Sequence, residues 1–170
     1  MPNPGPSDVA AITGHVLFEW HDVDGNLIHQ AESRNLITAV GDQLYAARGA
    51  GIGSPPAAPT GMKLGTGSTA VAKTGAGAAL VTYLAGSNKA FDATFPSAVA
   101  GVVTYKRTFA AGEATTASNI TEAVLVNDTI TTDATSTAAN TASRVLIPTP
   151  APKAAGDTLT VTWTHTLIGA

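Results

Sequence analysis

A stretch near the end of the sequence, residues 158–167, alternates strictly between two kinds of side chain. One set is mainly apolar and includes Trp163 and His165, whereas the other set consists of threonines. Because successive side chains of a strand leave opposite faces of a sheet, a period of two indicates a β-strand. Threonine is β-branched and suits a pleated surface that is only partly buried. The stretch therefore predicts a long antiparallel strand with an apolar face inward and a threonine face outward.

Composition limits the classes of protein to which this chain can belong. Its 170 residues suit one domain, and a net charge of −3 gives no electrostatic case for nucleic-acid binding. The absence of cysteine excludes disulfides, thiol nucleophiles and thiolate metal sites. Residues 1–12 lack the charged and apolar regions of a signal peptide, and no apolar run approaches the roughly 20 residues of a membrane helix. We expect a soluble protein that is made in a cytoplasm and binds no membrane.

The first segment, residues 1–12, contains Pro2, Pro4 and Pro6 at alternate positions. Proline restricts φ and has no backbone N–H, so this pattern predicts an extended arm instead of a helix. The segment is either a loose terminus or an arm that lies on a neighbouring subunit.

Residues 13–21 and 27–33 are strand-like runs separated by an Asp-Gly pair, which is typical of a hairpin turn. The turn residues Asp22, Asp24 and Asn26 also resemble the start of a calcium-binding loop. In such a loop, however, glycine occupies position six and glutamate position twelve, whereas here glycine falls at position four and Ser33 at position twelve. The hairpin is therefore the preferred interpretation.

Residues 38–48 change to a helical period, with Thr38 as the predicted N-cap and Gly49 as the predicted end. Residues 49–60 are rich in glycine, alanine and proline and predict a loop. Further strands are predicted at 61–65, 99–109, 120–126 and 143–147. The third of these is almost wholly apolar, so we expect it to be central and buried on both faces.

Residues 129–141 predict an exposed loop, and Pro148, Pro150 and Pro152 predict an extended edge or loop. The chain thus predicts an all-β fold: a single antiparallel β-sandwich or jelly-roll-like domain of about eight strands over residues 13–170. One short helix and the extended arm, residues 1–12, complete the prediction.

No motif in the sequence predicts catalysis, a cofactor or a metal site. Residues 67–74 nearly match a phosphate-binding loop, but Ala72 replaces its second glycine. His15 and His21 lie about 20 Å apart along one strand and cannot share a metal, so a zinc site would need one of them with His29 and a carboxylate such as Glu19. His165 is interpreted as a core or interface histidine.

Six short motifs, taken in order, resemble a family of small bacteriophage virion proteins. They run from D-V-D-G-N-L to K-A-A-G-D-T-L-T-V-T-W-T-H-T and occupy residues 22–27, 35–41, 64–70, 112–115, 120–127 and 153–166. Members of the family are labelled as virion structural, capsid decoration, or tail and fibre proteins. The resemblance implies a structural role in the virion and implies no catalytic residues.

On this basis we expect a capsid decoration protein that binds the outside of a phage head, bridges major capsid protein subunits and forms a homotrimer. The predicted contact residues lie in the arm and in the loop 49–60: Pro2, Pro4, Pro6, Pro55, Pro56 and Pro59. The first alternative is a tail, baseplate or fibre-base component. The second is a carbohydrate-binding adhesion module, although Trp20 and Trp163 both fall on apolar strand faces, away from the exposed positions that such sites use. An enzyme or a small-molecule binding protein is not expected.

Overall fold

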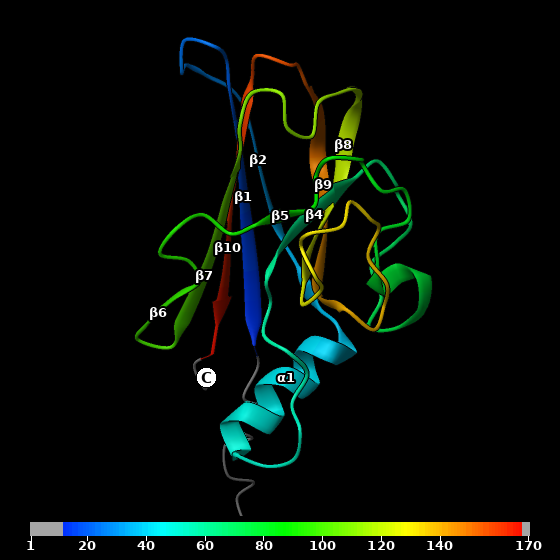
Figure 1. Ribbon diagram of the computed structural model, residues 1–170. Helices are drawn as coiled ribbons and strands as arrows, with labels where there is room; N and C mark the ends of the chain where they lie inside the picture. The colour runs from blue at the N-terminus through cyan, green and yellow to red at the C-terminus, as the bar shows by residue number, and fades with distance from the viewer. Residues whose placement is uncertain (1–11, 168–170) are drawn as a thin grey trace, which may run out of the picture.

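The computed structural model describes residues 12–167 and shows two five-stranded antiparallel sheets packed face to face (Figure 1). Sheet A has the order β2 (Leu27–Arg34), β1 (Thr13–His21), β10 (Thr158–Thr166), β7 (Val102–Phe109) and β6 (Ser97–Val99). Sheet B has the order β3 (Leu36–Ile37), β9 (Thr141–Lys153), β8 (Thr116–Val126), β4 (Gly61–Gly65) and β5 (Lys89–Ala90). The predicted all-β sandwich with one α-helix is confirmed.

The alternating stretch near the end of the sequence forms β10, in the middle of sheet A. It pairs with β1 on one side and β7 on the other, so that Trp163 lies opposite both Val16 and Tyr105. Every second residue from Leu159 to His165 is buried, whereas the threonines between them are partly exposed. The predicted strand and its apolar inner face are therefore confirmed.

The core fills the space between the two sheets. Its side chains come from the inward positions of both sheets, which are also the apolar positions of the sequence pattern. The largest that are fully buried are Trp20, Trp163, Phe18, Phe109, Met62, Leu64, Ile120, Leu125 and Leu159. As predicted, β8 is a central strand, and its second half is buried on both faces.

The β1–β2 hairpin forms as predicted. The Asp22 carboxylate accepts hydrogen bonds from the backbone N–H groups of Asp24 and Asn26, both at 2.9 Å. Gly25 has a φ of 83°, a backbone conformation that glycine adopts without a steric penalty. These residues therefore close a turn and do not form a calcium loop.

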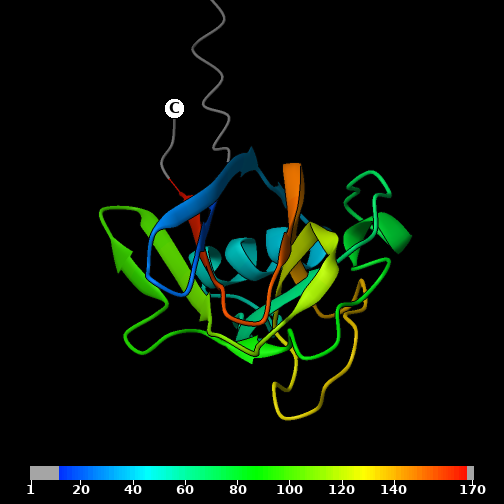
Figure 2. The ribbon, with the colours of Figure 1, turned by 90° about the horizontal axis from the view of Figure 1, so that it is seen from above.

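The helix α1 (Ala39–Ala50) lies across the end of the sandwich where β1 begins and β10 ends (Figures 1 and 2). Thr38 is its N-cap, as predicted, and accepts a hydrogen bond from the Gly41 N–H. The predicted end at Gly49 is wrong, because the left-handed residue that ends the helix is Gly51, with a φ of 64°. Among residues 12–167, no helix is long and apolar enough to cross a membrane.

One strand prediction is wrong, and the proline segment needs a closer description. Residues 99–109 do not form one strand, because Ala100 and Gly101 adopt positive φ and turn the chain between β6 and β7. The proline segment that was predicted to be an extended edge or loop forms the second half of β9. This half pairs with β8 on one side only, because β3 pairs with β9 just at Ser143 and Arg144, so the extended edge is confirmed. Its pairing with β8 shifts register there, and such irregular pairing tolerates residues that lack a backbone N–H.

Candidate functional site

The predicted contact residues are not brought together into one described site. Pro2, Pro4 and Pro6 lie outside the described residues. In the loop after α1, Pro55 and Pro56 are half-buried and Pro59 is buried. Hydrogen bonds from Asn127 to the Ala57 carbonyl, at 3.0 Å, and from Thr60 to the Asp128 carbonyl, at 2.6 Å, fasten this loop to the end of β8. The Pro59 side chain is thus packed inside the chain, next to the two hydrogen bonds that anchor the loop.

The outward side chains of sheet A form an open polar surface, here called the threonine face. It consists of the threonines of β10 at positions 158, 160, 162, 164 and 166 with their cross-strand neighbours. Thr160 lies opposite Thr108, with 3.3 Å between their hydroxyl oxygens, and Thr164 lies opposite Thr104. Lys106 lies opposite Thr162. These side chains are only partly buried, so water can satisfy their polar groups.

The outward side of sheet B is different, because segments 66–88 and 127–140 lie over it, away from sheet A (Figures 1 and 2). We call it the covered face. It carries Lys63, Glu122 and Arg144, and all three side chains have no exposed area. Isolated charges at such depth would be strongly unfavourable, so each must find several polar partners.

Glu122 and Arg144 form a buried, two-pronged ion pair beneath segment 66–88. Nε and Nη2 of Arg144 approach one carboxylate oxygen of Glu122 at 3.1 and 2.6 Å. The other oxygen accepts 3.0 Å hydrogen bonds from the backbone N–H groups of Gly67, Val81 and Thr82. Arg144 also donates to carbonyl groups of the covering segment, at Thr69 and Gly77. The pair therefore holds the covering segment against the sheet.

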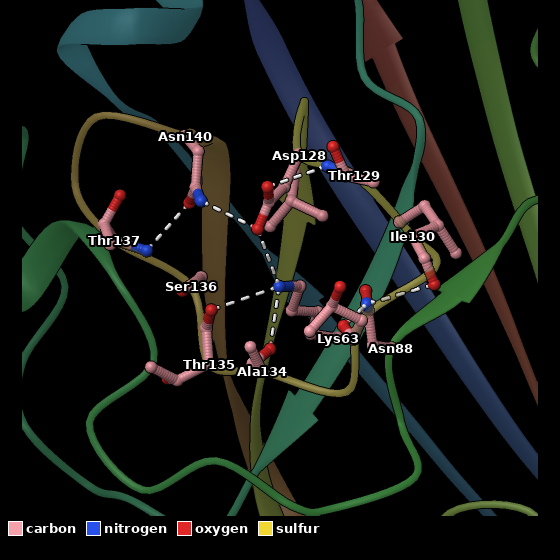
Figure 3. Close-up of polar contacts among 12 residues, drawn as sticks. Lys63, Asn88, Asp128, Thr129, Ile130, Ala134, Thr135, Ser136, Thr137 and Asn140 are labelled. Carbon is pink, nitrogen blue, oxygen red and sulfur yellow. Dashed lines mark hydrogen bonds and ion pairs between the residues drawn. The ribbon is translucent and has the colours of Figure 1, made fainter.

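Lys63 does the same for segment 127–140 (Figure 3). Its ammonium donates to the Asp128 carboxylate at 3.0 Å and to the carbonyls of Ala134 and Thr135 at 2.8 and 3.1 Å. The hydrogen bond from Lys63 lowers the pKa of the Asp128 carboxyl. Asn140 donates to the same carboxylate at 2.9 Å. All three donors of the ammonium are used, so Lys63 is a structural clamp and not a free amine for catalysis.

The segment predicted to be an exposed loop, residues 129–141, is thus partly buried. Ser136 is buried and its hydroxyl accepts a hydrogen bond from the Leu80 N–H at 2.9 Å, which joins the two covering segments. The Asn88 amide makes a further contact between these segments by donating to the Ile130 carbonyl at 3.3 Å. Composition could not predict that this segment packs on sheet B, because most of its hydrogen bonds to the sheet and to segment 66–88 use backbone atoms.

A second polar cluster lies between α1 and sheet A. The Tyr45 hydroxyl is 3.1 Å from the Tyr105 hydroxyl and 2.6 Å from Nδ1 of His165, and Nε2 of His165 is 3.2 Å from the Asn35 amide nitrogen. Burial lowers the pKa of His165 to about 4, so the ring is neutral at pH 7. Burial also raises the pKa of Tyr45. The interpretation of His165 as a core histidine is confirmed, and neither hydroxyl is activated as a nucleophile.

The other histidines do not converge. His15 lies 3.3 Å from Glu32 at the surface, and Nε2 of His29 lies 2.7 Å from the Thr149 carbonyl oxygen. Between residues 12 and 167, no group of three or more histidine, aspartate and glutamate side chains could hold a metal ion. The glycine-rich stretch 67–74 follows an antiparallel strand and leads only to the short 3-10 helix η1 (Gly75–Ala78). It therefore lacks the parallel strand and long helix of a phosphate-binding loop.

The sequence did not predict one apolar surface, at the end of the sandwich opposite α1 (Figure 1). Val23, Leu27 and Ile28 are 80%, 51% and 54% exposed at the β1–β2 turn. Beside them lies a largely apolar groove of about 600 Å³, whose lining includes Ile28, Ala117, Ala151 and Pro152. We call this the tip surface. A register shift at Trp20/His21 leaves both Leu27 and Ile28 outside the core. In the sequence, this surface was indicated only by two large apolar residues standing next to each other at the start of a strand.

No family model, curated protein or solved structure matches this chain.

Proposed function

We propose that this chain is a structural protein of a bacteriophage virion: a capsid decoration protein that binds the outside of the head and bridges major capsid protein subunits. The order of the six motifs supports the virion assignment. The observation that carries a binding role is the tip surface, because contiguous exposed apolar side chains mark surfaces that contact another protein. The buried clamps of the covered face supply a rigid body to present that surface.

In this proposal the tip surface packs against adjacent capsid subunits and releases water from Val23, Leu27 and Ile28. Burial of apolar area supplies the free energy, at roughly 25 cal/mol per Å². A protein that binds the expanded shell but not its precursor stabilises the expanded shell by mass action. Closed symmetry of the proposed homotrimer would present several tip surfaces at once and raise the effective affinity.

The direct test is to purify particles of the phage that encodes this chain, count its copies by quantitative mass spectrometry and locate it by cryo-electron microscopy. Hundreds of copies on the head support the proposal. A few to tens of copies at the tail overturn the head location in favour of a tail, baseplate or fibre-base component. Absence from the particle overturns a virion role altogether, and a glycan array then tests the adhesion alternative.

A variant tests whether the tip surface makes the contact. Ile28→Asp places a charge in the proposed interface, and we expect its affinity for purified expanded capsids to fall at least about tenfold, or about 1.4 kcal/mol. Val99→Asp is the matched control, because Val99 is 73% exposed on β6, away from the tip. Equal binding of both variants would show that another surface contacts the capsid.

A further inference from the structure

A second groove lies at the end of the sandwich covered by α1. Its volume is about 960 Å³, and the helix supplies most of its lining. The apolar part of the lining comes from Ile12, Tyr45, Ala46, Gly49 and Leu167. Tyr45 is held in place here, since its hydroxyl is bonded to His165 and Tyr105 inside the protein.

The charged rim of this groove is asymmetric. Lys73 is paired with Asp42 at 2.6 Å. Arg48 also lines the groove and is exposed, and within residues 12–167 no carboxylate forms an ion pair with it. The groove therefore combines a surface of small apolar groups with one positive charge that has no partner in the described part of the chain.

The residues that precede Ile12 suit this groove in length and chemistry. Residues 7–11 read Ser-Asp-Val-Ala-Ala, so three small apolar side chains follow the one charged residue in 2–11, Asp8. Fully extended, five residues span about 17 Å, which exceeds the roughly 10 Å of helix between Asp42 and Gly49. Because Ile12 is itself part of the groove wall, the attached segment has a high effective concentration there.

We propose that residues 7–11 occupy this groove in the same chain, with Val9 and the two alanines against Tyr45, Ala46 and Gly49 and with the Asp8 carboxylate beside Arg48. Docking at this position determines where the proline-rich residues 2–6 leave the body of the protein. The inference is independent of the virion role, because it concerns only contacts within one chain.

The chain has no cysteine, so no native thiol competes when the contact is tested by disulfide trapping. In the double variant Val9→Cys/Ala46→Cys, mild oxidation at low protein concentration should convert most molecules into a monomeric disulfide-closed form, measured by intact mass and free-thiol titration. The control is Val9→Cys/Val23→Cys, because Val23 is exposed at the opposite end of the sandwich. The control pair should remain largely as free thiols within the same time.

Charge variants on the same background test the ion pair. Asp8→Lys should reduce the closed yield severalfold, and adding Arg48→Glu should restore it. A disulfide-linked dimer would assign the groove to residues 7–11 of a second copy and overturn docking within one chain. Equal yields for the test and control pairs would overturn the docking itself. Amide chemical shifts of α1 give a separate readout in the cysteine-free chain, and unchanged shifts on Asp8→Lys would also contradict the contact.

Discussion

The outward faces of the two sheets differ in exposure and in charge. The threonine face of sheet A is open, and its polar groups are uncharged or can reach water. The covered face of sheet B carries Lys63, Glu122 and Arg144 with no exposed area. Charged residues in a strand usually indicate a solvated face, yet here they mark the face that irregular chain covers. A charge inside an otherwise apolar strand can therefore indicate a covering segment.

The composition of the covering segments explains how they satisfy buried charges. They are rich in glycine, alanine and threonine, and small residues allow backbone groups to approach a side chain closely. A Cβ on Gly67 would lie 2.5 Å from a Glu122 carboxylate oxygen, and one on Gly77 would lie 2.7 Å from the Ala70 carbonyl. Glycine is thus required at both positions for segment 66–88 to pack this closely over the Glu122–Arg144 ion pair.

The largest effect is expected when the buried ion pair is broken. Glu122→Ala leaves the Arg144 guanidinium without its anion and three backbone N–H groups without their acceptor, so we expect a loss of roughly 3–5 kcal/mol in the free energy of unfolding. Urea unfolding measures it. Glu19→Ala, on the open side of sheet A, is the control and should change stability by less than about 1 kcal/mol. Similar losses for both variants would contradict the contrast between the faces.

Removal of the second clamp should have a slightly smaller and more local effect. Lys63→Met keeps an unbranched side chain but loses three donated hydrogen bonds, so we expect about 3 kcal/mol of destabilisation. Segment 127–140 should become the first site of proteolytic cleavage under native conditions. Lys106→Met on the threonine face is the matched control. Unchanged cleavage in Lys63→Met would show that other contacts hold the segment.

A pH titration compares a buried histidine with an exposed one. Because the pKa of His165 is about 4 in the folded protein and about 6.5 in an unfolded chain, the unfolded state binds more protons between these values. The free energy of unfolding should therefore fall as the pH decreases from 6.5 to 4, by up to about 3 kcal/mol. His165→Gln should remove this part of the pH dependence. His15→Gln, at the surface beside Glu32, should retain it, and the opposite pattern would contradict the assignment.

The smallest effect on stability is expected on the threonine face. Thr162→Lys places a long, solvated side chain on a partly exposed position, so the free energy of unfolding should change by no more than about 0.5 kcal/mol. Sedimentation of the variant then measures its oligomeric state, and a capsid-binding assay measures whether it still assembles. Normal assembly indicates a face that stays in solvent, whereas a folded monomer that fails to assemble identifies the threonine row as an interface.

Local patterns were enough for much of the fold. The alternation in 158–167, the Asp-Gly turn and the Thr38 cap each depend on interactions within a few residues, and each is confirmed. Errors arose where two local signals competed. Gly49 and Gly51 are both possible helix ends, and only the latter adopts the left-handed conformation. The run 99–109 contained an Ala-Gly turn that its apolar residues concealed.

The sequence by itself determined the class of fold and the direction in which the strands of sheet A face, because the period of a strand is a local property. Tertiary structure alone decided which groups bind the buried charges of the covered face of sheet B. Lys63 donates to carbonyl groups more than 60 residues away in the sequence. The Glu122 carboxylate accepts hydrogen bonds from N–H groups at two separate places in segment 66–88. Backbone donors and acceptors are the same in every residue, so no side-chain pattern records which of them a buried charge will use.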